Sequence, residues 1–319
     1  MIRSEKVEFA GAQGAMLAGR LDWPLGMPRA YALFAHCFTC SKDVLASTRI
    51  SQGLASRGIA VLRFDFTGLG HSGGEFANTN FSSNVLDLVA AAGFLRSKYE
   101  APRILIGHSL GGAAILAGAA HISEAVAVAT IAAPFDPKHV VHLIGDQVGK
   151  IETEGEAQVV LAGRQFTVRR QFLEDISGQS LKDCAHNLRK ALLILHSPTD
   201  ELVGIDNARR IYEAALHPKS FISLDGADHL LTRRQDAEYV TDLLSTWAAR
   251  YLKEPPIAAP DAESGTVVVT GADRSRGESY LAHVISAHGH LLKADEPVSN
   301  GGTDTGPGPY DLLLASLGS

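Results

Sequence analysis

Ser109, Asp200 and His229 are the side chains of this sequence that could carry out nucleophilic chemistry together. Ser109 stands in the segment GHSLG (107–111), where glycines allow a tight turn that pushes the serine outward. A serine hydroxyl is a weak nucleophile unless a neighbouring base removes its proton. His229 can act as that base, and Asp200 can hold the imidazole in the required tautomer. These residues in this order predict acyl transfer through a covalent intermediate on Ser109.

Each of these assignments has a structural alternative. GHSLG could be a glycine-rich turn with a surface serine, although a predicted strand before it and a predicted helix after it favour the catalytic interpretation. Asp200 could cap the N-terminus of a helix over 205–216. Asp225 and Asp228 are rival acids, but they stand too close to His229 in the sequence to brace its ring from the far side.

The oxyanion formed during acyl transfer needs backbone N–H donors. Leu110 follows the nucleophile and begins a predicted helix, so its N–H is the first candidate donor. The second donor is expected in the loop after an early buried strand, and we assign it to Phe38. We expect His36, Cys37 and His108 to line the substrate site beside these donors.

Cysteine is rare in this chain. Three cysteines, namely Cys37, Cys40 and Cys184, do not make a disulfide framework in 319 residues, which agrees with a reducing compartment. Cys37 and Cys40 form a C-x-x-C, but the sequence offers no second cysteine pair for zinc and no thioredoxin-like surroundings. We interpret the pair as part of the oxyanion loop, with a redox-sensitive switch as the alternative. We expect no metal and no cofactor.

The segments around these candidates alternate between short apolar runs and helical patterns. Mostly apolar runs bounded by turn signals predict parallel strands buried on both faces, at 33–37, 60–66, 103–109, 125–133 and 191–197. Helices are predicted near 44–57, 82–98, 110–121, 205–216 and 235–252. Two further strands, 6–11 and 15–23, are predicted to form an antiparallel edge hairpin. The alternation predicts a doubly wound, mostly parallel α/β sheet.

Two regions depart from this alternation. Residues 134–188 are too long for a simple connection, and we predict a small lid over the carboxyl edge of the sheet. Residues 253–265 form a proline-rich linker, which separates a domain over 1–252 from a segment over 266–319. In that segment we predict strands at 266–271 and within 279–295, a glycine- and proline-rich loop at 296–309, and then a helix.

The composition limits the possible partners and location. Hydrophobic residues make up 45% of the chain and charged residues 20%, as in ordinary globular proteins, and the formal net charge is −6. This acidic balance disfavours nucleic acids and anionic membranes, because both require a concentrated basic surface. No apolar run is long enough for a membrane span, and the first residues lack the apolar stretch of a signal peptide. We therefore expect a cytoplasmic protein.

Over residues 5–251 the sequence resembles the α/β-hydrolase superfamily. Five motifs in order carry the resemblance, namely His36 of the oxyanion loop, DFTGLGHSGG (65–74), GHSLGG (107–112), PTD (198–200) and GADH (226–229). The family's glycine after the loop histidine is Cys37 here. The resemblance implies metal-free hydrolysis of an ester, thioester or amide through an acyl-enzyme. Asp65 is expected to stabilise its glycine-rich loop rather than react.

Residues 266–319 resemble the N-terminal part of the OsmC/Ohr family of thiol peroxidases, on ADEPVSNGGTDTGPGPYDLLLASLG (294–318). The resemblance implies an intertwined dimer that reduces hydroperoxides with two cysteines. Residues 266–319 contain no cysteine, so this chemistry is not expected here. We interpret the segment as a truncated, partial α+β unit of a fusion protein. It is expected to be disordered, docked on the first domain, or paired with a second chain in a homodimer.

These observations favour a serine carboxylesterase whose partner is a small-molecule, short-acyl ester. A peptidase or amidase is the alternative of the same fold, with a carboxylate cluster in the lid holding a peptide N-terminus; the candidates are Asp136, Asp146, Glu152, Glu154 and Glu156. A third hypothesis is a non-catalytic module of a peroxide-stress fusion protein, against which the complete triad argues. Dehalogenase or epoxide hydrolase chemistry needs an aspartate nucleophile, and Ser109 excludes it.

Overall fold

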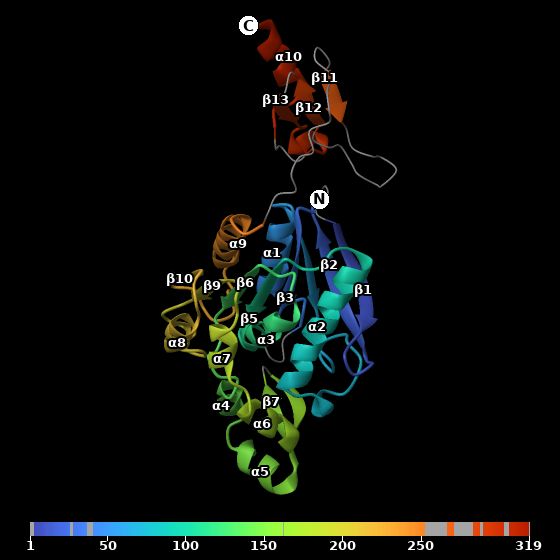
Figure 1. Ribbon diagram of the computed structural model, residues 1–319. Helices are drawn as coiled ribbons and strands as arrows, with labels where there is room; N and C mark the ends of the chain where they lie inside the picture. Colours follow the sequence, from blue (N-terminus) through green and yellow to red (C-terminus); the bar gives the residue numbers. More distant parts are fainter. Residues whose placement is uncertain are drawn as a thin grey trace.

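A computed structural model describes residues 3–25, 28–36, 41–161, 163–252, 267–270, 283–287, 290–302 and 306–318. An eight-stranded sheet lies at the centre of the first 252 residues (Figure 1). Its strands, in spatial order, are β1 (Arg3–Ala10), β2 (Met16–Trp23), β4 (Ile59–Phe64), β3 (Ala30–Ala35), β5 (Ile104–His108), β6 (Ala127–Ile131), β9 (Ala191–His196) and β10 (Lys219–Ser223). The strands from β4 to β10 pair in parallel, whereas β1 and β2 form an antiparallel hairpin at the edge. The predicted mostly parallel sheet is confirmed.

Helices cover both faces of this sheet and make two hydrophobic cores. On one face α1 (Leu45–Ala55) and α9 (Arg234–Ala249) pack through residues such as Ile50 and Leu244. The other face carries α2 (Phe81–Lys98), α3 (Leu110–Gly118) and α8 (Asp206–Ala214). The strands between them are buried on both sides, which explains why their sequences are continuously apolar rather than alternating.

The insertion after β6 has secondary structure of its own. Its elements are α4 (His139–Ile144), α5 (Gln147–Glu154), β7 (Glu156–Leu161), β8 (Arg164–Arg169), α6 (Arg170–Ser177) and α7 (Leu181–His186), and β7 pairs with β8 in a separate antiparallel hairpin. Figure 1 shows α5, α6 and β7 as a lobe beyond one end of the central sheet.

Hydrogen bonds at several places fasten this insertion to the body of the protein. Asp175 of α6 accepts hydrogen bonds from the backbone N–H (2.8 Å) and the hydroxyl (2.5 Å) of Ser82, in the first turn of α2. On the other side, His139 of α4 donates through Nε2 to the carbonyl of Leu202 at 2.6 Å. The second contact ends in the turn that carries Asp200, so the insertion touches the loop of the candidate acid.

The C-terminal segment contains a three-stranded antiparallel sheet and a helix. The strands are β11 (Val267–Thr270), β12 (His283–Ala287) and β13 (His290–Ala294), and α10 (Pro309–Leu317) follows them. Strands and a final helix were predicted here, whereas the linker 253–265 lies outside the described residues. Among the helices of the described residues, none has the length and apolarity that a membrane crossing requires.

Candidate active site

Ser109 occupies a strained turn between β5 and α3. Its backbone has φ 55° and ψ −128°, a region that residues with side chains rarely adopt and that costs about 1–3 kcal/mol. The Ser109 N–H donates to the carbonyl of Ile131 at 2.8 Å, and the Ser109 carbonyl accepts from the Gly112 N–H at 2.8 Å. These bonds tie the turn to the neighbouring strand and to the first turn of α3, which maintains the strained conformation.

The glycines beside Ser109 are required by close approaches of the backbone. A Cβ atom at Gly107 would lie 2.4 Å from the carbonyl oxygen of Gly111. A Cβ atom at Gly111 would lie 2.3 Å from the carbonyl oxygen of His36, at the end of β3. The spacing Gly-x-Ser-x-Gly therefore lets β3, β5 and α3 converge around the serine.

The structure brings the three predicted catalytic side chains together from loops far apart in the sequence. The Nε2 atom of His229 lies 3.0 Å from the Oγ atom of Ser109. The Nδ1 atom of the same ring lies 2.7 Å from the Oδ2 atom of Asp200. Asp200 and His229 are buried, whereas Ser109 is partly exposed. This is the arrangement in which an imidazole takes a proton from a hydroxyl while a carboxylate stabilises the resulting charge.

Asp200 is held as a carboxylate by its own turn. Its Oδ1 atom accepts the backbone N–H groups of Leu202 and Val203, each at 2.9 Å. Burial favours the neutral acid, but the hydrogen bonds from His229 and from these N–H groups outweigh it and hold the pKa of Asp200 below its ordinary value. The capping alternative does not fit these contacts, because the N-terminal flanking residue of α8 is Ile205.

The rival acids have other partners. Asp225 accepts a hydrogen bond from the hydroxyl of Ser223 at 2.5 Å. Asp228 accepts from the backbone N–H of Thr232 at 2.8 Å and from its hydroxyl. Both carboxylates stabilise the loop that carries His229 from the outside, and the imidazole pairs with Asp200.

Of the two predicted oxyanion donors, Leu110 lies among the described residues. Leu110 is the first residue of α3, so its N–H lies at the positive end of a helix, directly after the nucleophile. Phe38, the predicted second donor, lies outside the described residues, as do Cys37 and Cys40. His36, the last described residue before them, lies against Gly111.

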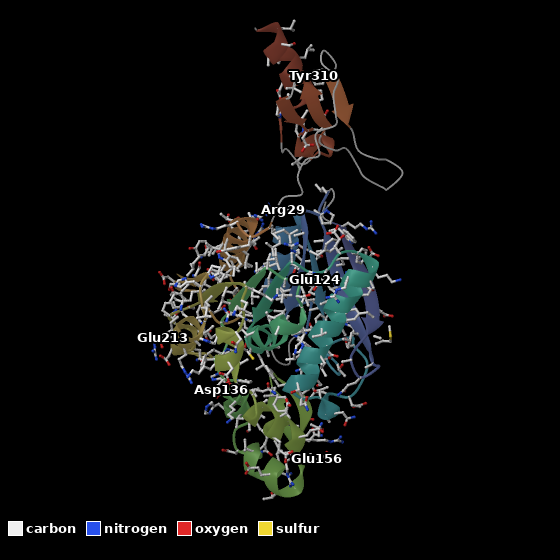
Figure 2. All side chains as sticks on the ribbon, in the orientation of Figure 1. Arg29, Glu124, Asp136, Glu156, Glu213 and Tyr310 are labelled. Carbon is white, nitrogen blue, oxygen red and sulfur yellow. The ribbon has the colours of Figure 1, made fainter. Side chains whose placement is uncertain are left out.

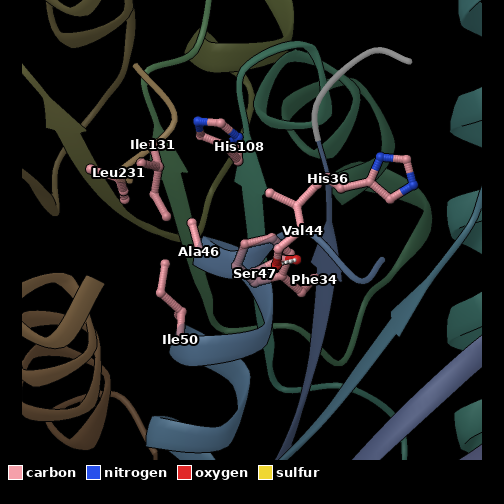
Figure 3. Close-up of a pocket in the computed structure, with 9 residues that line it drawn as sticks. All are labelled: Phe34, His36, Val44, Ala46, Ser47, Ile50, His108, Ile131 and Leu231. Carbon is pink, nitrogen blue, oxygen red and sulfur yellow. Dashed lines mark hydrogen bonds between the residues drawn. The ribbon is translucent and has the colours of Figure 1, made fainter. Parts of the chain in front are cut away.

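His36 and His108 line a small, mostly apolar pocket at the carboxyl ends of β3 and β5 (Figure 3). The two residues are only 2% and 6% exposed. The His36 ring contacts Phe66 edge-on, with 5.2 Å between ring centroids. The Nε2 atom of His108 lies 2.7 Å from the carbonyl oxygen of His229. This burial favours supporting roles for both histidines over the predicted direct contact with a substrate.

The glycine-rich loop 65–74 is organised by a buried ion pair that sequence reasoning missed. Lys42 Nζ lies 2.8 Å from Asp65 Oδ2, and the Lys42 backbone N–H donates to Asp65 Oδ1 at 2.6 Å. Asp65 also accepts the backbone N–H of His71 at 2.9 Å, and both members of the ion pair are buried. As predicted, Asp65 stabilises its own loop. None of these contacts joins it to Ser109, Asp200 or His229.

Replacing Lys42 with methionine should destabilise the protein by about 3 kcal/mol, because it leaves the buried Asp65 carboxylate without its cation. Urea unfolding of the full chain measures the effect. Lys150→Met is the matched control, since Lys150 forms an exposed pair with Glu154 that is worth well under about 1 kcal/mol. Equal midpoints for the two variants would show that the Lys42–Asp65 pair adds nothing to stability.

Two of the candidate acids of the insertion already have cationic partners. Figure 2 shows Asp136 and Glu156 at separate places on the insertion. Glu156 pairs with Arg169 at 2.9 Å, and Glu154 pairs with Lys150 at 3.8 Å. Within the described part of the chain, no group of three or more His, Cys, Asp or Glu side chains is arranged to hold a metal ion.

Comparisons with known proteins agree with this geometry. The Alpha/beta hydrolase family matches residues 32–297. The esterase domain of a Rhodothermus marinus protein is 51% identical, covers 79% of this chain and 100% of its own, and superposes with a TM-score of 0.66. Monoacylglycerol lipase of Mycolicibacterium smegmatis is 23% identical over 286 aligned positions, and the match covers 79% of this chain and 100% of the lipase. Est1E of Butyrivibrio proteoclasticus, solved with ferulic acid bound, is 18% identical, covers 77% of this chain and 99% of its own, and has a TM-score of 0.67.

Proposed function

The chain belongs to the alpha/beta hydrolase family, and on that basis we propose that it is a serine carboxylesterase that cleaves small, short-acyl esters. One observation carries the proposal: the continuous contact from Asp200 through His229 to Ser109, at 2.7 Å and 3.0 Å. The similarity to esterase and lipase relatives supports ester bonds as the target.

The reaction uses the residues as follows. His229 removes the proton of Ser109 as the hydroxyl oxygen attacks the ester carbonyl, and Asp200 stabilises the imidazolium that forms. The N–H of Leu110 donates to the oxyanion, where the helix terminus adds positive potential. His229 then protonates the departing alkoxide, which leaves an acyl-enzyme on Ser109. A water molecule activated by His229 hydrolyses this intermediate and restores the serine.

A cavity beside the nucleophile supports a small acyl group. It is narrow and mostly apolar, and it is lined by Phe66, Phe81, Leu110 and Ala114, among others. We also propose that residues 134–188 act as a lid, because the insertion is fastened at Ser82 and at the Asp200 turn.

The test is hydrolysis of p-nitrophenyl esters from acetate to decanoate. We expect kcat/KM to be highest for the shortest chains and to fall toward decanoate, because the cavity is small. A maximum at decanoate would overturn the short-acyl assignment while leaving the esterase assignment intact. Faster turnover of an aminoacyl p-nitroanilide than of the matched ester would favour the amidase alternative, which the ion pairs of Glu154 and Glu156 do not support.

We further propose that residues 266–319 form an OsmC-like segment through which two chains could pair. The order of three strands and a helix, and the exposed Leu313, Leu314 and Leu317 of α10, support this interpretation. In an isolated chain such an apolar helix face leaves a large hydrophobic surface in water.

A further inference from the structure

His108 immediately precedes the nucleophile in the chain, and its side chain forms a hydrogen bond with the backbone of a distant loop. It is the last residue of β5, next to Ser109. Ile131 and Leu231 line the same pocket, and His108 is buried (Figure 3). A polar ring in such a place is costly unless it is hydrogen-bonded. Its partner is therefore informative about its role.

That partner is the backbone of the candidate base. The Nε2 atom of His108 donates to the carbonyl oxygen of His229 at 2.7 Å, and the two ring centroids are 5.2 Å apart. Burial and the neighbouring His229 ring lower the pKa of His108 to about 4, so the ring is neutral near pH 7. A neutral imidazole has one N–H, and the carbonyl acceptor places it on Nε2.

Two backbone hydrogen bonds that flank His229 are local, whereas the carbonyl of Thr232 accepts from the Arg49 guanidinium of α1. Ala227 donates to the carbonyl of Leu224, and Leu231 donates to the carbonyl of Asp228, within the same loop. These bonds shape the loop without attaching it to the strand of the nucleophile. The bond from His108 joins His229 to β5 across 121 residues of sequence.

We propose that His108 is a positioning residue, which holds the backbone of His229 so that its imidazole stays within hydrogen-bond distance of Ser109. The inference rests on the proposed function, because it concerns the same site. His108 and Ser109 are neighbours in the chain, so a shift of the nucleophile carries the anchor of the base with it. The neutral state of His108 matters as well, because a positive charge 5.2 Å away would oppose the imidazolium that forms on His229.

Two nearly isosteric variants of the full chain test the proposal. His108→Gln places a neutral amide N–H at about the reach of Nε2, whereas His108→Met fills the apolar pocket without a donor. We expect His108→Met to lower kcat for p-nitrophenyl acetate by about 10- to 100-fold, because misplacing a catalytic group by about 1 Å costs up to about 10²-fold. KM should not change in either variant, since His108 does not contact the ester. His108→Gln should restore most of the lost kcat.

Thermal unfolding is the control that each variant is folded. If the methionine variant does not unfold cooperatively, His108→Asn replaces it. Asparagine is too short to reach the carbonyl of His229, so it should behave like methionine. Equal kcat in the glutamine and methionine variants would overturn the proposal, as would a loss expressed in KM alone. Fluorophosphonate labelling of wild type and Ser109→Ala distinguishes a failure of the proposed function from a failure of this inference. If wild type is not labelled at Ser109, the proposed function fails; if it is labelled and His108→Met is fully active, only this inference fails.

Discussion

Replacing Ser109 with alanine is expected to lower kcat for p-nitrophenyl acetate by on the order of 10⁶-fold, as in a comparable triad. The reason is geometric. The Oγ atom is the group that His229 Nε2 contacts at 3.0 Å, and the turn at φ 55° pushes it out from the sheet edge. Without Oγ the acyl-enzyme cannot form, and only the residual rate from the oxyanion donors and substrate binding remains, about 10³–10⁴-fold above water.

This variant should keep its fold, which makes the result interpretable. The bonds that hold the turn, from the Ser109 N–H to Ile131 and from Gly112 to the Ser109 carbonyl, belong to the backbone and survive the substitution. Unfolding midpoints and fluorophosphonate labelling serve as the controls. A folded Ser109→Ala protein with undiminished turnover would exclude Ser109 as the nucleophile.

The central sheet could be predicted from the sequence because burial on both faces leaves a simple signal. The strands β3, β4, β5, β6 and β9 read as continuous apolar runs. The less obvious strand is β10, at the free edge of the sheet, where the sequence KSFIS is only partly buried. The hairpin of β7 and β8 was not predicted, although β7 alternates between exposed and buried residues, as a strand buried on one face does.

Site residues could be predicted where each one follows a predicted strand. They could not be predicted where side chains from two separate loops pair with each other. Ser109, Asp200 and His229 each follow a strand in the order that the topology requires. Their order in the sequence therefore predicts that the three side chains lie close together. The pairing of Lys42 with Asp65 joins two loops, and neither segment carries a signal for the other. His108 was predicted to line the substrate site, but it is buried, and its acceptor lies 121 residues away in the sequence.

In an Asp200→Asn variant, the side-chain amide could adopt only one orientation. The Oδ1 atom of Asp200 accepts two backbone N–H groups, from Leu202 and Val203. Only the oxygen of an asparagine amide can take that place, so the NH₂ group must face His229 Nδ1. It would donate to Nδ1 and move the imidazole proton to Nε2. Nε2 faces Ser109, and in that tautomer it cannot accept the hydroxyl proton.

Asp200→Asn should therefore lower kcat by about 10⁴-fold with little change in the fold, because the wrong tautomer is stabilised rather than a cavity opened. KM should stay near the wild-type value, since Asp200 contacts His229 and its own turn rather than the ester. Asp225→Asn is the matched control, because Asp225 lies in the His229 loop but pairs with Ser223, and we expect it to retain its activity. Comparable losses in the two variants would mean that the loop as a whole, rather than the tautomer set by Asp200, limits the reaction. The expected difference in kcat between the two variants would identify the carboxylate at position 200 as the group that decides which nitrogen of His229 carries the proton.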